Sequence, residues 1–120
     1  MEIFQSFAFE AAHRLPAVAP EHKCSRLHGH SYRVEVWVDA PVDPVTGWVV
    51  DFAEIELAFA PLLEELDHQY LNDVPGLHNP TSENVAAWIL SHLRASLPAL
   101  DRVVVRETSD SGAVARTKDL

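Results

Sequence analysis

Cysteine, glycine and long apolar runs are scarce in this chain, and each shortage excludes a class of protein. Among 120 residues there are one cysteine and four glycines, which rules out an internal disulfide framework and a glycine-rich repeat. No segment approaches the roughly 18–20 apolar residues of a membrane-spanning helix. The first residues also lack the basic start and apolar run of a signal peptide. We therefore expect a single domain over residues 1–120, located in the cytoplasm and not in a membrane.

Positive charge is scarce as well. Nine Lys and Arg residues stand against 18 Asp and Glu residues, which gives a formal charge of −9. Binding to a nucleic acid backbone needs a basic surface, so nucleic acid is excluded as a partner. Arg14, Lys23 and Arg26 nevertheless gather around one short segment. This local basic rim favours a small anionic ligand, and solvated loop charges are the alternative interpretation.

The polar and apolar pattern predicts strands first and helices later. Four segments show strand character, most of them by alternating polar and apolar residues. They span residues 3–13, 30–39, 48–50 and 102–108. Asp51 and Thr81 are typical N-caps of two amphipathic helices, the first with Pro61 inside it and the second ending before Pro98. We therefore predict an α+β fold, with an antiparallel four-stranded sheet and two helices packed on one face.

Three histidines have the spacing of a metal site. His28 and His30 are two residues apart at the start of a strand, so their side chains leave the same face. His13 ends another strand, and an adjacent antiparallel strand would bring it alongside them. Three neutral imidazoles hold a catalytic zinc with one position open for substrate. The alternative is that each is an ordinary polar or packed histidine, as we interpret His22, His78 and His92.

Cys24, the only cysteine, has two possible roles beside these histidines. As a fourth ligand it would close the site and make the zinc structural. As a free thiolate it would act as a base or nucleophile, with its pKa lowered by zinc and by the positive charges of Lys23 and Arg26. The position between two positive residues favours the free thiolate. An inert buried cysteine would be unusual in so polar a segment.

Two further groups have acid–base chemistry. Asp67 and His68 stand together where the first predicted helix ends, and such pairs serve as proton relays. Glu107 follows the apolar run 103–105, where a carboxylate can accept two parallel hydrogen bonds from a guanidine-like heterocycle edge. Taken alone, the Asp-His pair is a weak signal because such pairs are common by chance, and a solvated strand-end glutamate is the better interpretation of Glu107.

Together these pieces resemble the 6-pyruvoyltetrahydropterin synthase family. The likeness spans nearly the whole chain and is carried by the segments 9–15, 24–30, 47–52, 66–68, 70–72, 79–84 and 107–108. It implies the tunnelling fold, or T-fold, in a homohexamer built as a dimer of trimers with active sites between subunits. It also implies that one zinc ion per subunit is held by His13, His28 and His30.

The resemblance assigns roles to the other residues too. Cys24 would be the proton acceptor and His68, supported by Asp67, the second proton-transfer group. Glu107 would anchor a pterin ring, with Thr81 and Ser82 beside it.

The three-residue gap between Cys24 and His28 resembles the bacterial branch of the family. That branch converts 7,8-dihydroneopterin triphosphate to 6-carboxy-5,6,7,8-tetrahydropterin, acetaldehyde and triphosphate in queuosine biosynthesis, a tRNA modification pathway. From their charge, we assign Arg14, Lys23 and Arg26 to the triphosphate. The alternatives are a pyruvoyl-forming synthase, an aldolase-like relative, or a non-catalytic zinc- or pterin-binding module.

Overall fold

The computed structural model describes residues 1–120 and contains one five-stranded sheet. Its strands are β1 (Glu2–His13), β2 (His28–Asp39), β3 (Gln69–Tyr70), β4 (Leu100–Thr108) and β5 (Ser111–Arg116). The order across the sheet is β3-β1-β2-β4-β5, and only the short β1–β3 pair is parallel. Three 3-10 turns complete the chain: η1 (Lys23–Ser25), η2 (Leu71–Asp73) and η3 (Thr117–Asp119).

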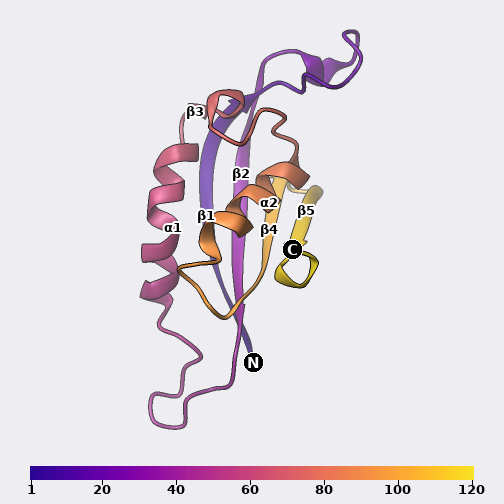
Figure 1. Cartoon of the computed structure of the whole chain (residues 1–120). Coiled ribbons are helices and arrows are strands. Elements are labelled where there is room, and N and C mark those ends of the chain that lie inside the picture. Colours follow the sequence, from indigo (N-terminus) through magenta and orange to yellow (C-terminus); the bar gives the residue numbers. More distant parts are fainter.

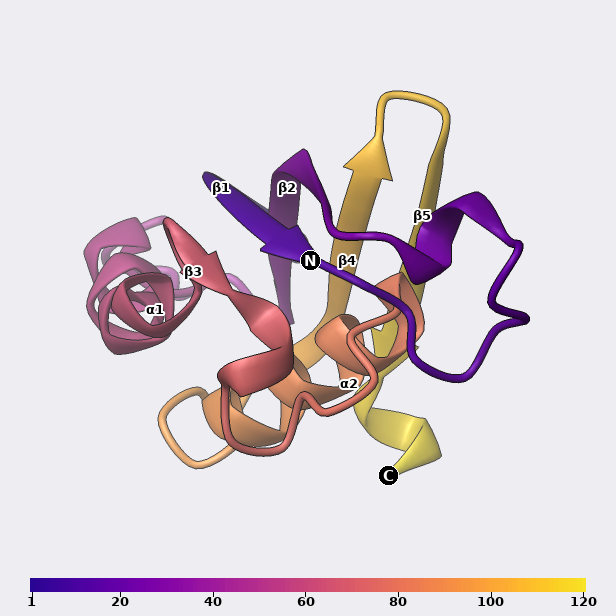
Figure 2. The same ribbon diagram turned by 90° about the horizontal axis from the view of Figure 1, so that it is seen from above.

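Both helices cover the same face of the sheet, as Figures 1 and 2 show. They are α1 (Phe52–Leu66) and α2 (Ser82–Leu93). The predicted caps are present: the Asp51 carboxylate accepts from the Ala53 N–H at 2.9 Å, and the Thr81 hydroxyl accepts from the Asn84 N–H at 3.1 Å. Pro61 lies within α1 without dividing it. None of the helices is long and apolar enough to cross a membrane.

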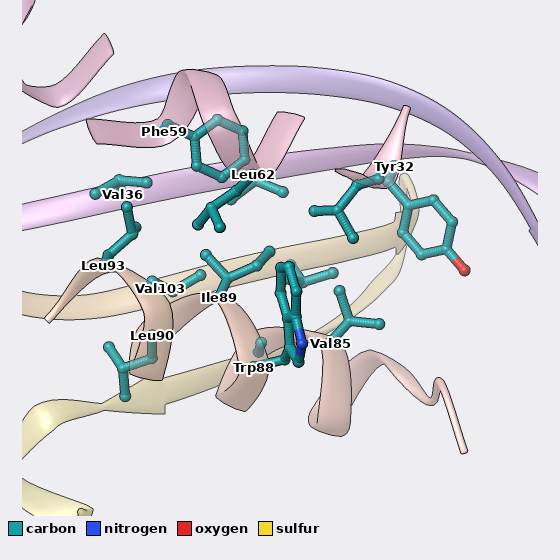
Figure 3. Packing of buried hydrophobic residues seen from close by; sticks show 14 of the residues in the cluster. Tyr32, Val36, Phe59, Leu62, Val85, Trp88, Ile89, Leu90, Leu93 and Val103 are labelled. Carbon is teal, nitrogen blue, oxygen red and sulfur yellow. The ribbon is translucent and has the colours of Figure 1, made fainter. Parts of the chain in front are cut away.

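The hydrophobic core lies between the helices and the covered face of the sheet. One cluster of 23 buried residues fills this layer. In Figure 3, side chains of α2 such as Ile89 and Leu93 face Val36 of β2 and Val103 of β4. The opposite, uncovered face carries the polar residues of the same strands, because successive side chains alternate between faces.

The α+β class, the mostly antiparallel sheet and the two helices on one face are confirmed, but the strand count of four is wrong. Residues 48–50 form no strand. The Trp48 carbonyl accepts from the Asp43 N–H at 2.9 Å and closes a turn, while Val49 and Val50 pack against the edge of the core. The polar segment after Ser109 instead forms β5, which pairs with β4. β3 also escaped prediction, because its two residues have no alternation to detect.

The pairing of β1 with β2 is the part of the fold that positions the site. The two strands pair continuously, from Glu2 opposite Asp39 to His13 opposite His28. The end of β1 and the start of β2 therefore lie side by side at one end of the sheet, where Ala11 is opposite His30. The chain then leaves and returns through the loop 14–27, which contains η1.

Candidate functional site

The three predicted histidines converge at this end of the sheet. The β1–β2 register puts His13 beside His28, and His30 follows two residues later on the same face. One ring nitrogen from each lies within 4.8 Å of those of the other two. The Nε2 atoms of His13 and His28 are 3.0 Å apart. His13 is fully buried, whereas the other two are partly exposed and border the cavities described below.

Hydrogen bonds to carbonyl oxygens fix the protonation of two of these rings. His13 Nδ1 lies 2.8 Å from the Pro80 carbonyl, and His28 Nδ1 lies 2.7 Å from the Arg26 carbonyl. A carbonyl only accepts, so in each neutral ring the hydrogen is on Nδ1 and Nε2 carries a lone pair. Two lone pairs therefore face each other at 3.0 Å. A bound cation relieves this repulsion, and imidazole Nε2 groups with Nδ1–H held by carbonyls are the usual ligands of such an ion.

Burial favours the neutral form of two of the three rings, His13 and His30. It is the main cause that lowers the pKa of both His13 and His30 below 6.5, and it outweighs the nearby Glu107 carboxylate, which acts in the opposite direction. Neutral imidazoles are the form that binds metals. The donor set therefore fits a divalent metal ion, and three imidazoles are typical of a catalytic zinc site.

Tyr32 contacts one of the candidate metal ligands from the buried side, and the sequence analysis did not identify it. Its side chain is buried and stacks on Phe9 with ring centroids 4.9 Å apart. Its hydroxyl lies 3.2 Å from His13 Nδ1. Burial also raises the pKa of Tyr32 well above its ordinary value, so the hydroxyl stays protonated. Its position two residues after His30, on the same face, was the available signal.

Cys24 lies beside the histidines without joining their cluster. It sits in η1, and a cavity of about 270 Å³ is lined by Lys23, Cys24, His28 and His30. The Cys24 thiol is not among the grouped ligand atoms. Its backbone N–H donates to His22 Nδ1 at 3.0 Å, so His22 caps the turn that presents the thiol. His22 is exposed, which agrees with its interpretation as a surface residue, and this contact gives it a capping role.

Asp67 and His68 form a pair attached to β1. His68 Nδ1 is 2.9 Å from Asp67 Oδ1, and the same oxygen accepts from the Glu10 N–H at 3.0 Å. This backbone hydrogen bond is the main cause that lowers the pKa of Asp67. The His68 N–H donates to the Glu10 carbonyl at 2.6 Å, and the backbone of His68 is left-handed, with φ of 59°.

His68 of this pair faces a second cavity. His68 and His30 both line this space of about 490 Å³. Cys24 does not line it, so within one chain the thiol and the His68 side chain belong to different cavities that share His30 as a border.

Glu107 lies closer to the histidine cluster than its sequence position indicated. It is at the end of β4, and its Oε1 is 3.3 Å from His13 Nε2 and 3.6 Å from His30 Nε2. Thr81 and Ser82 follow Pro80, whose carbonyl holds His13. Thr81 caps α2, and Ser82 is buried at its first position.

The basic residues remain at the outside of the loop 14–27. Arg14, Lys23 and Arg26 are exposed, and none of them forms a salt bridge. Lys23 alone borders the Cys24 cavity. The Arg14 backbone is anchored on Asn72, whose side chain accepts from the Arg14 N–H at 3.0 Å and donates to the Arg14 carbonyl at 2.8 Å.

Comparison with known proteins agrees with this geometry. The family model for 6-pyruvoyl tetrahydropterin synthase matches residues 2–118. The chain is 47% identical to a 6-carboxy-5,6,7,8-tetrahydropterin synthase of Synechocystis, over 92% of this chain and 89% of that one. It is 36% identical to a dihydroneopterin monophosphate aldolase of Pyrococcus furiosus, over 88% of each chain.

A solved structure has the same fold. The 6-pyruvoyl tetrahydropterin synthase of Caenorhabditis elegans superimposes with a TM-score of 0.88 at 26% identity, covering 97% of this chain and 94% of that one. Fold, histidine cluster and family match thus agree over almost the whole sequence. The chain is a homologue of 6-carboxy-5,6,7,8-tetrahydropterin synthase, a lyase, and belongs to the 6-pyruvoyl tetrahydropterin synthase family.

Proposed function

We propose that the chain, as one domain over residues 1–120, is a zinc-dependent lyase of queuosine biosynthesis. It converts 7,8-dihydroneopterin triphosphate and one water to 6-carboxy-5,6,7,8-tetrahydropterin, acetaldehyde and triphosphate. The observation that carries the proposal is the convergence of three imidazoles, two of which turn their Nε2 atoms toward each other at 3.0 Å. The 47% identity to a 6-carboxy-5,6,7,8-tetrahydropterin synthase supports this branch over the others.

The residues at the proposed metal site have separate roles. His13, His28 and His30 hold one zinc ion per subunit. Zinc bound there makes the hydroxyl groups of the substrate side chain more acidic and stabilises the negative charge that develops on them. Cys24, in the cavity that His28 and His30 border, is the base that receives a proton. Lys23 borders the same cavity.

His68 is the second proton-transfer group. The Asp67 carboxylate holds the Nδ1–H of its ring at 2.9 Å, which leaves Nε2 free to exchange a proton. The Glu10 N–H fixes Asp67 in turn, so the ring is oriented from the backbone of β1. Because Cys24 and His68 line different cavities, we infer that a complete site combines them across two subunits of a homohexamer, a dimer of trimers.

The remaining residues bind the substrate. Glu107 accepts two hydrogen bonds from the guanidine-like edge of the pterin ring, and Thr81 and Ser82 lie beside it. Arg14, Lys23 and Arg26 meet the triphosphate. The absence of any salt bridge partner for these three side chains supports their availability to an anion. A triple substitution to glutamine is expected to raise the Michaelis constant for the triphosphate, and an unchanged constant would remove this assignment.

The decisive experiment compares two variants of the zinc-loaded protein. Cys24→Ala is expected to keep zinc but lose turnover of 7,8-dihydroneopterin triphosphate, whereas His28→Ala is expected to lose zinc. If Cys24→Ala releases zinc and unfolds, and the wild type shows no turnover, the chain is a non-catalytic zinc-binding module with Cys24 as fourth ligand. The position of the thiol outside the grouped ligand atoms argues against that module.

The product identifies the branch. Mass spectrometry of the wild-type reaction is expected to detect 6-carboxy-5,6,7,8-tetrahydropterin. A 6-pyruvoyl product, or a product of side-chain cleavage alone, would instead assign the chain to the synthase or aldolase activity named for the other relatives.

A further inference from the structure

Glu107 lies next to two of the candidate metal ligands, and binding of the pterin ring alone does not require this closeness. Val103 and Val105 are the preceding residues on its face of β4, and both are fully buried against the core. The next residue on that face, Glu107, therefore points inward, and only 26% of its side chain is exposed. Its Oε1 contacts two of the three candidate metal ligands, at 3.3 Å from His13 Nε2 and 3.6 Å from His30 Nε2.

A hydrogen bond does not explain the contact with His13. His13 Nδ1 lies 2.8 Å from the Pro80 carbonyl, so in the metal-binding form of the ring its one hydrogen is on Nδ1 and Nε2 has none to donate. The carboxylate oxygen thus faces a lone pair at 3.3 Å. Two negatively polarised atoms at this distance repel each other unless a cation lies between them.

Three of the separations between these atoms are close to those between ligands of one metal ion. In a tetrahedral zinc site with bonds of about 2.0–2.1 Å, neighbouring ligand atoms are about 3.3 Å apart. The separations here are 3.0 Å for His13 to His28, 3.3 Å for His13 to Glu107 and 3.6 Å for His30 to Glu107. Glu107 therefore stands where a fourth ligand would stand, a position that the Cys24 thiol does not take.

We propose that Glu107 is the fourth ligand of the resting metal site and leaves it to hold the pterin ring when substrate binds. The identity of the metal and of the substrate rests on the function proposed above. The exchange breaks the bond between carboxylate and metal, and the freed carboxylate accepts the two N–H groups of the ring edge. The open coordination position is thus created only when a pterin is present. This couples recognition of the ring to activation of its side chain.

The experiment uses the full-length protein loaded with zinc or with cobalt(II), whose visible absorption reports coordination. Glu107→Gln is expected to lower zinc affinity by about tenfold or more, measured by competition with a chromophoric chelator, and to change the cobalt spectrum. Glu35→Gln is the matched control. It removes the same charge from the neighbouring strand β2, on the uncovered face away from the histidines, and is expected to change neither property.

The second measurement tests the exchange itself. The probe is 6-methylpterin, which has the ring edge but no side-chain hydroxyl that could reach the metal. Its binding to the wild type is expected to shift the cobalt spectrum toward that of Glu107→Gln. Should Glu107→Gln fail to fold, Glu107→Asp withdraws the carboxylate by one methylene and is expected to shift the spectrum in the same direction.

Two results would overturn the proposal. One is a Glu107→Gln protein that no longer binds 6-methylpterin but keeps wild-type zinc affinity and the wild-type cobalt spectrum, which would make Glu107 an anchor only. The other is a wild-type spectrum that 6-methylpterin leaves unchanged while it binds. Failure of the proposed function is distinguishable: the wild type would then not turn over the pterin triphosphate, while the metal measurements would still report whether Glu107 is a ligand.

Discussion

The left-handed backbone of His68 gives a stability prediction whose sign can be tested. At φ of 59°, a residue with a Cβ atom is strained by about 1–2 kcal/mol relative to glycine. Glycine loses about 0.5–1 kcal/mol through its greater freedom in the unfolded chain. The relief of strain is the larger effect. His68→Gly is therefore expected to be more stable than His68→Ala by about 0.5–1 kcal/mol.

Both variants lack the imidazole, so the effect of losing it cancels in the difference between their free energies of unfolding. Both variants lack the contact with Asp67, which a side chain exposed by 77% makes only weakly stabilising. Leu57, an exposed residue inside α1, is the control, because there alanine should be more stable than glycine by about 1 kcal/mol. Urea denaturation of all four variants without metal measures both differences. An alanine variant at His68 as stable as the glycine variant would refute the reasoning.

Two further predictions concern the same end of the sheet. At Gly112, an added Cβ would lie 2.3 Å from the Val105 carbonyl oxygen. Gly112→Ala is therefore expected to displace β5 and to destabilise the protein by about 1–3 kcal/mol. Thermal denaturation measures this effect, and an unchanged melting temperature would contradict it. Burial lowers the pKa of His13 and His30 below 6.5, so both stay neutral when folded but take up protons when unfolded. The free energy of unfolding of the metal-free protein should therefore be retained above about pH 6.5 and fall as the pH drops below it; His13→Gln should weaken this dependence, and a dependence equally strong in that variant would contradict the assignment.

The sequence was sufficient to predict the histidine cluster because its geometry is local. Alternation along a strand puts His28 and His30 on one face, and a single antiparallel neighbour brings in His13. The N-caps Asp51 and Thr81 were also predicted, since a capping side chain acts within a few residues of itself.

Other features depend on contacts that are distant in sequence. The position of Glu107 against His13 requires β4 to pair with β2, which no local pattern specifies. β5 is an edge strand with a polar composition, so its pairing rather than its residues makes it a strand. Conversely, residues 48–50 have strand-forming side chains but no partner to pair with. Val49 and Val50 are partly buried against the core instead, and Trp48 is exposed.

The unbroken register between β1 and β2 limits how this sequence can change length over evolution. One residue inserted within β1 would turn His13 to the uncovered face, and one inserted within β2 would do the same to its histidines, since side chains alternate along a strand. The loop 14–27 has no such constraint, because its residues form no sheet pairs. An insertion between Cys24 and Arg26 therefore leaves the sheet register unchanged, whereas the single residue between His28 and His30 is fixed. In related sequences, the position of the thiol can therefore change with the length of this loop, while the positions of the histidines stay the same.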